Sequence, residues 1–468
     1  MRTQSGMILA VVAMALLAGC EKPTPPSGAS KGGLPAPTTV EPAAIEPATG
    51  EPAAAEPASP APSGASSTVT PAADKPAVAQ AVARVEKLGG AVRREQGKVV
   101  GVDLYEIQTT DADVALLAAL EDLQQLVLWG ADITDTGVEH LVGLKNLTNL
   151  TLENTAITDK GVETVCRIKS LKSLNLRRST YMTDAALAHL AALPNLQYLE
   201  LLYNNISDAG MEHLKGLTKL RLLDLRGCVL VTDSGLEHLA GLTNLRALKL
   251  RSPAMTDTGM GHLAGLKNLV TLSIEDSSSL SDEGLKVLEK FTEMGDLTIF
   301  RCPNISDEGL AHLATMPKLK QLFLRGTYIN GSCLAYVEGA KDLRKLDLAE
   351  TQANDDALAH VAKLKNLAWL DLWHTQVTDA GLKHLTALPN LKYLRLTDIA
   401  VTDAGLAEVA KITSLGELDL ELLKISDAGL KQLAALKNLK TLNLANVEVS
   451  DAAIAELKAA LPELQVAQ

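Results

Sequence analysis

A short pattern of apolar and polar positions recurs along most of this chain at a nearly constant interval. In residues 147–152, leucine holds the first, fourth and sixth positions, and the segment Thr158-Asp159-Lys160-Gly161-Val162 follows. Self-similarity at a period of about 20 to 50 residues predicts a repeat fold, in which units stack to bury their apolar faces. The aspartate recurs at steps of 24 or 25, at positions 111, 135, 159, 184, 208, 233, 257, 282, 307, 355, 379, 403, 427 and 451, with Gly331 replacing one aspartate.

Each unit contains the signals of one strand, one turn and one short helix. The alternation of leucine with polar residues in 147–152 predicts a strand buried on one face, with the other face in solvent. The Thr158 hydroxyl is suited to cap the free amides of a helix start, and the Asp159 carboxylate favours the positive end of the helix dipole. An apolar stripe of the following helix is formed by Val162, Val165 and Ile168.

Stacked units of this kind place all strands in one parallel sheet and all helices on the opposite surface. The expected fold is therefore an α/β solenoid with a concave sheet and convex helices. The pattern L-x-x-L-x-L-x-x-(Thr/Asn/Cys), at residues 196–204 and 220–228, resembles the leucine-rich-repeat family. The helix start at residues 232–236 is similar to the cysteine-containing subclass known from F-box proteins, and to bacterial repeat lipoproteins. This resemblance implies a horseshoe and covers residues 99–466, about fifteen units.

The first part of the chain has a different composition. Residues 1–20 predict a lipoprotein signal, because Arg2 precedes an apolar core that is too short to span a bilayer. Its Leu-Ala-Gly-Cys end resembles the bacterial lipobox, which implies lipidation of Cys20. Residues 21–76 consist mainly of Pro, Ala, Thr, Ser, Gly and Glu and predict a disordered tether. Residues 77–98 predict a helical cap, and residues 99–468 the repeat solenoid.

Charge and cysteine content exclude some classes of function. The formal net charge of −12 argues against a nucleic-acid-binding protein, which needs a basic surface. Apart from Cys20, four cysteines occur in different units, which favours buried thiols without redox chemistry. We expect no cofactor and no metal.

Two polar constellations invite a chemical interpretation. Eight histidines lie five residues after the repeat aspartate, on the helical side, where duplication of a surface residue explains them better than metal binding or proton sensing does. Glu350, His374 and Asp398 occupy equivalent strand ends in three consecutive units. We expect no enzyme here, because no nucleophile in the same phase completes a triad and an open sheet implies no pocket.

The solvent-facing strand positions are the most informative ones, because the repeat leaves them free to vary. Large rings gather there although a solvated sheet face has no packing use for them, which predicts a binding surface. The predicted ligand-binding residues are Phe323, Trp369, Asp371, Trp373, His374, Tyr393 and Arg395. A second candidate surface consists of Arg177, Arg178, Arg226, Arg251, Arg301 and Arg325, which pairing with Glu153, Glu200, Asp224 and Glu275 would also explain.

These patterns predict a non-enzymatic, lipid-anchored protein of the bacterial cell envelope that presents its concave surface to a protein or glycan partner. A passive envelope spacer without a specific partner is the alternative. The ring-rich surface distinguishes the two, since a spacer has no need of it.

Overall fold

The computed structural model describes residues 75–468. The predicted signal segment, Cys20 and all but the last two residues of the predicted tether lie outside the described residues. Within residues 75–468, every helix is too short or too polar to cross a bilayer.

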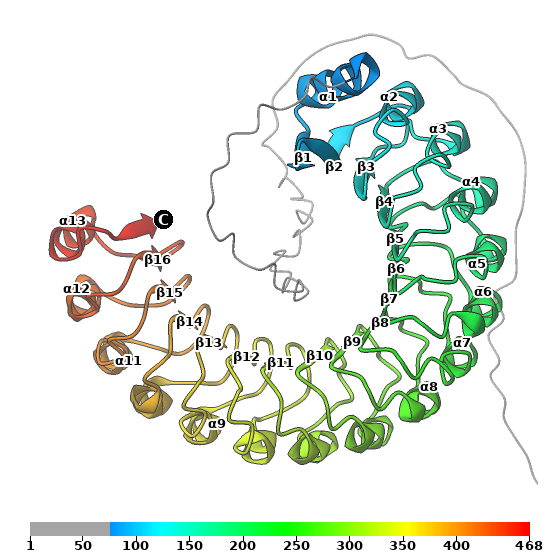
Figure 1. Ribbon diagram of the computed structural model, residues 1–468. Helices are drawn as coiled ribbons and strands as arrows, with labels where there is room; N and C mark the ends of the chain where they lie inside the picture. Colours follow the sequence, from blue (N-terminus) through cyan, green and yellow to red (C-terminus); the bar gives the residue numbers. More distant parts are fainter. Residues whose placement is uncertain (1–74) are drawn as a thin grey trace, which may run out of the picture. The chain divides into compact units, whose positions relative to one another are not determined.

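The described part of the chain is an α/β solenoid, an open arc with strands along its inner side and helices along its outer side (Figure 1). Strand β1 pairs with β2 in antiparallel orientation, and from β2 to β17 each strand pairs in parallel with the next. The strands are β1 Ala91–Glu95, β2 Lys98–Gln108, β3 Gln125–Trp129, β4 Asn149–Glu153, β5 Ser173–Asn175, β6 Tyr198–Glu200, β7 Leu222–Arg226, β8 Ala247–Arg251, β9 Thr271–Glu275, β10 Asp296–Phe300, β11 Gln321–Phe323, β12 Lys345–Asp347, β13 Trp369–Asp371, β14 Tyr393–Arg395, β15 Glu417–Asp419, β16 Thr441–Asn443 and β17 Gln465–Ala467.

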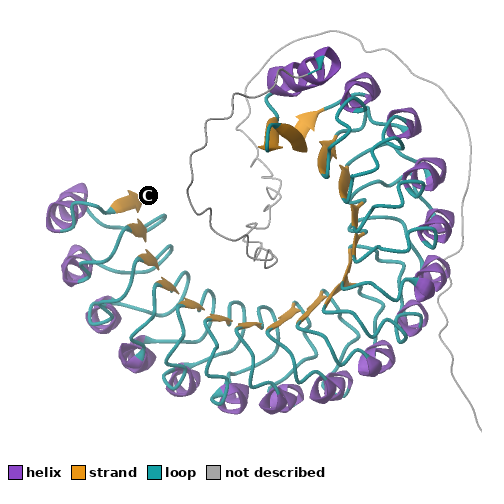
Figure 2. Cartoon of the chain, in the orientation of Figure 1, coloured by secondary structure: helices purple, strands orange, loops and turns teal. Residues whose placement is uncertain are grey.

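Short helices cover the convex side of the sheet (Figure 2). The α-helices are α1 Pro76–Leu88, α2 Asp111–Leu117, α3 Asp135–Glu139, α4 Asp159–Val165, α5 Asp184–Leu190, α6 Asp208–Met211, α7 Asp233–Glu237, α8 Asp257–His262, α9 Asp355–Val361, α10 Asp379–Leu382, α11 Asp403–Val409, α12 Asp427–Gln432 and α13 Asp451–Ala460. The 3₁₀ helices are η1 Glu212–Gly216, η2 Leu263–Gly265, η3 Gly284–Lys290, η4 Gly309–Thr315, η5 Ser332–Val337, η6 Lys383–Ala387 and η7 Leu433–Ala435. The predicted fold class is confirmed.

One continuous apolar core runs between the sheet and the helices. In the unit that begins at residue 147, the leucines of the strand and the stripe of Val162, Val165 and Ile168 are all buried. Each unit buries its apolar residues against its neighbours, as a solenoid requires, because no single unit could enclose them.

The repeat aspartates link successive coils. Asp135 accepts the backbone N–H of Thr158 at 2.8 Å and the Thr158 hydroxyl at 2.7 Å, and the same threonine oxygen accepts the N–H of Lys160. The threonine therefore caps its helix as predicted. The aspartate, which is predicted to favour the dipole of its own helix, also binds the helix start of the next coil.

This link explains the glycine of the Thr-Asp-x-Gly motif. A Cβ atom on Gly161 would lie 2.3 Å from Asp135 Oδ1, and one on Gly259 would lie 2.2 Å from Asp233 Oδ1. The glycine is thus required by the close approach of the preceding coil's carboxylate. At Gly331 the aspartate is missing, so this coil offers no carboxylate to the helix start at Asn354.

At the N-terminal end, helix α1 covers the first coil with Ala81, Val82 and Val85. The sequence pattern predicts only a helical cap over residues 77–98. In the structure the helix ends at Leu88, and β1 then forms a hairpin with β2. The end of the solenoid is covered by a helix and a strand together.

Candidate functional site

The solvent-facing positions of the short strands β11 to β15 form the candidate surface. In β13, Leu370 is buried in the core, whereas Trp369 is only half-buried on the concave side. Register pairing then places Trp369 beside Lys345 on one flank and Tyr393 on the other. The period-two alternation of a strand is what directs these side chains away from the core.

Three rings make continuous contact on this surface. The ring of Trp369 stacks on that of Tyr393, with centroids 5.1 Å apart and planes 8° apart. The ring of Phe323 meets Trp369 edge-on, with centroids 5.9 Å apart and an angle of 63°. Both are favoured arrangements of aromatic pairs. We call Phe323, Trp369 and Tyr393 the ring cluster.

Trp373 lies outside the strand in which the repeat pattern predicts it. The spacing of four residues predicts that Trp369 and Trp373 share one strand, but β13 ends at Asp371 and Trp373 belongs to the following turn. Its ring contacts the guanidinium groups of Arg325, 4.4 Å from the ring centroid, and Arg395, at 4.9 Å. Trp373 therefore already interacts with cations of its own chain, and it is a poorer test of ligand binding than Trp369.

His374 follows in the same turn, with a left-handed backbone (φ 52°). Its Nδ1 lies 2.7 Å from Asp398 Oδ2, whereas Glu350 forms an ion pair with Arg325 at 2.7 Å. The three predicted strand-end residues are thus divided between two separate contacts. Both His374 and Asp398 are exposed, so solvent weakens this pair.

Contrary to the expectation of no pocket, these turns border a shallow hollow of about 830 Å³. It lies beside the ends of the strands, and its lining includes Tyr328, Glu350, Gln352, His374 and Asp398. The imidazole and the carboxylate at its border could hydrogen-bond a polar group. We assign this hollow no chemistry.

Two carboxylates occupy adjacent strands at the edge of the ring cluster. Asp371 is buried and accepts the backbone N–H of Trp373 at 2.9 Å, while Arg395 Nη1 lies 3.5 Å from its Oδ2. Asp347 is its register partner and accepts the backbone N–H of Ala349 at 2.8 Å. Burial, with repulsion from Asp371, raises the pKa of Asp347 to about 7, and burial also raises the pKa of Asp371.

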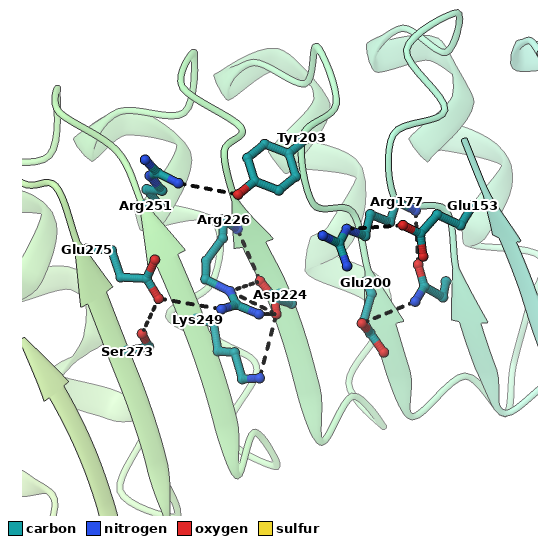
Figure 3. Close-up of polar contacts among 11 residues, drawn as sticks. Glu153, Arg177, Glu200, Tyr203, Asp224, Arg226, Lys249, Arg251, Ser273 and Glu275 are labelled. Carbon is teal, nitrogen blue, oxygen red and sulfur yellow. Dashed lines mark hydrogen bonds and ion pairs between the residues drawn. The ribbon is translucent and has the colours of Figure 1, made fainter. Parts of the chain in front are cut away.

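The arginine set makes internal contacts (Figure 3). Arg226 donates to Asp224 at 2.9 Å and lies 3.5 Å from Glu275. Arg177 lies 3.4 Å from Glu153, Arg251 and Arg301 both pair with Asp276, and Arg178 lies over the Tyr203 ring. These contacts support the pairing interpretation, because a partner would have to displace existing ones.

The sequence predicts Asp347 only as a nearby acid that would favour a cationic or hydroxyl-rich partner, and Lys345 and Asp419 are not among the predicted site residues. Asp347 is one period before Asp371, so the 24-residue phase alone places the two carboxylates side by side. Arg395 Nε is 3.6 Å from Asp419 Oδ2, so this arginine is shared between two acids. Their position within the 24-residue repeat could have identified these residues, whereas their burial could not be predicted from that position.

The family comparison agrees with this architecture. A family model described as a leucine-rich repeat region matches residues 186–409. Among solved structures, the chain is similar to an internalin from Listeria monocytogenes, at 20% identity and a TM-score of 0.49, covering 84% of this chain and 94% of that one. It is also similar to a leucine-rich-repeat protein from Leptospira interrogans, at 19% identity and a TM-score of 0.46, covering 75% of this chain and 92% of that one. No curated protein matches the chain at a significant level.

The repeating strand-and-helix coils have the leucine-rich-repeat architecture, and the family match over residues 186–409 supports a leucine-rich-repeat protein. This fold in general serves protein–protein interaction.

Proposed function

We propose that this protein is a non-enzymatic binding protein that is anchored to the bacterial cell envelope through a lipid on Cys20 and presents its concave surface to a protein or glycan. The ring cluster supports this proposal. Its three rings lie on the solvent side of β11, β13 and β14, where they do not fill the core. Large rings on a rigid surface anchor partners at low cost in conformational entropy.

The geometry favours binding over catalysis. His374 is paired with Asp398 and Glu350 with Arg325, but within residues 75–468 no serine or cysteine hydrogen-bonds the His374 ring as the nucleophile of a triad would. The rigid sheet instead holds the rings in place before a partner arrives. A partner therefore gains contacts without ordering a loop.

Photo-crosslinking in native envelopes tests this proposal. Benzoylphenylalanine is placed at Phe323 or Tyr393, with Tyr336 in η5 as an exposed aromatic control on the convex side. We expect a discrete crosslinked product from the two concave positions and none from Tyr336. A product from Tyr336 alone would place binding on the convex side, and the absence of any product would favour the passive spacer.

A further inference from the structure

One row of register partners crosses the candidate surface. The third residues of β11 to β15 pair in the order Phe323, Asp347, Asp371, Arg395 and Asp419. Neighbouring strands are about 4.8 Å apart, so the Asp347 and Asp371 carboxylates are close enough to repel one another. The row therefore places two acids together between a ring and a guanidinium.

Compensation of these charges is incomplete. Arg395 approaches Asp371 at 3.5 Å and Asp419 at 3.6 Å, so one cation is divided between two acids. Its Nε donates to the Thr397 hydroxyl at 3.1 Å, and its guanidinium also lies over Trp373. In the described part of the chain, Asp347 forms no ion pair. Lys345 shares the strand of Asp347, in register with Trp369.

The ring cluster extends to both sides of Asp347. Phe323 comes from β11 and Trp369 from β13, and their rings meet although β12, the strand of Asp347, lies between those two strands. A cation on this surface would therefore find ring faces beside carboxylates. Ring faces attract cations through their quadrupole, and carboxylates form the stronger, charge-assisted hydrogen bonds.

We propose that the concave surface from β11 to β15 docks a basic polypeptide segment, with one lysine or arginine side chain held by Asp347 against the ring cluster and attracted by the buried charge of Asp371 beside it. This inference rests on the proposed function and specifies its partner. Charge complementarity supports it, because acids outnumber bases at the first and third positions of β12 to β15. The acids there are Asp347, Asp371, Glu417 and Asp419, and the bases are Lys345 and Arg395. In β7 and β8, by contrast, Arg226 and Lys249 approach Asp224 at 2.9 and 3.8 Å.

Docking of a cation at this pair depends on pH. Because the pKa of Asp347 is raised to about 7, a proton competes with the incoming cation at and below neutral pH. Arg325 and Arg395 favour the ionised form of Asp347, while burial and Asp371 oppose it. Affinity for a basic segment therefore rises as pH increases through about 7.

The test uses the purified full chain and a labelled synthetic peptide of alternating lysine and serine residues. A glutamate-serine peptide and a neutral oligosaccharide serve as comparison probes. We expect Asp347→Asn to weaken binding of the basic peptide about tenfold at about pH 8 and to have little effect at about pH 5.5, where the pair holds a proton. Glu212→Gln, which removes one exposed charge on the convex side, is expected to leave binding unchanged.

Trp369→Ala separates this inference from the proposed function. If the native crosslinked partner loses affinity for Trp369→Ala but not for Asp347→Asn, the concave binding surface stands and the cation site is wrong. If the protein binds the oligosaccharide but not the basic peptide, and Asp347→Asn leaves oligosaccharide binding intact, the inference is overturned in favour of a glycan partner. Equal losses in Asp347→Asn and Glu212→Gln would also overturn it, because they would show only general attraction to an acidic protein. If neither Trp369→Ala nor Asp347→Asn changes any binding, both proposals fail.

Discussion

Replacing Asp347 by asparagine is expected to stabilise this protein at neutral and alkaline pH, although the residue belongs to the proposed site. In the folded chain its pKa is raised from 3.8 to about 7 by burial and by Asp371. Between about pH 4 and 7 the folded protein thus retains a proton that the unfolded chain has lost, so the free energy of unfolding falls as pH rises through that window. Above about pH 7 Asp347 is ionised in both states, and the unfavourable free energy of its buried charge in the folded protein is fully present.

The magnitude follows from the shift. Roughly three pKa units at about 1.4 kcal/mol each give a ceiling of about 4 kcal/mol. Asp347 is only half-buried, so solvent screening reduces this to about 1 to 3 kcal/mol. Asparagine keeps an oxygen that can still accept the Ala349 N–H, so the substitution removes the charge without losing that hydrogen bond.

Urea unfolding of wild type and Asp347→Asn at about pH 5 and pH 8 measures this effect. We expect a higher midpoint for the variant at pH 8, and a smaller difference at pH 5. Asp224→Asn is the control, because Asp224 is a concave acid that is fully buried and that Arg226 and Lys249 neutralise. It should destabilise the protein by leaving two cations without their acid. If Asp347→Asn lowers the urea midpoint at pH 8 as Asp224→Asn does, repulsion between Asp347 and Asp371 does not destabilise the folded protein, and the reasoning is refuted.

The remaining predictions concern the repeat and the anchor. Leu370→Ala should cost about 2 to 5 kcal/mol by calorimetry or urea unfolding, as other buried leucine truncations do, whereas His213→Ala should cost under about 1 kcal/mol. A loss of several kcal/mol at His213, or metal-dependent melting, would contradict the interpretation of the histidines as surface copies. Gly259→Ala should lower the melting temperature because its Cβ would meet Asp233, and Gly143→Ala, with no atom within 4 Å, should not; equal effects would refute the role of the inter-coil carboxylate. Cys20→Ser should release the protein from membranes or leave an uncleaved precursor, and continued lipid labelling of this variant would exclude the lipobox.

The period of the sequence was enough to predict the fold. Leucine spacing in each coil, as in residues 147–152, specifies one buried strand face, and the fixed step between aspartates specifies parallel stacking. The contact from Asp135 to Thr158 could not be read from this pattern, because it joins residues of different coils across a distance that only the pitch of the stack determines. The same limit applies to the hairpin of β1 and β2, which depends on how the end of the stack is covered.

For the candidate site, the position of each residue within the repeat predicted which side chains are neighbours, but it did not predict what those side chains contact. Trp369 and Tyr393 share a phase, and they stack. Trp373 was placed incorrectly because β13 is short and the chain turns after Asp371, so period-two alternation no longer applies there. The raised pKa of Asp347 depends on burial and on the charge of Asp371, and the period of the repeat does not specify how deeply a side chain is buried.

The most direct test of the concave binding surface is a titration of the crosslinked partner, once purified, against wild type, Trp369→Ala and Tyr198→Ala. Tyr198 holds the same first position in β6 that Trp369 holds in β13, which makes it a matched ring outside the cluster. We predict that Trp369→Ala weakens binding by about 2 kcal/mol or more while Tyr198→Ala leaves it unchanged. Loss of affinity in Tyr198→Ala alone, or in neither variant, would contradict the assignment of binding to the ring cluster.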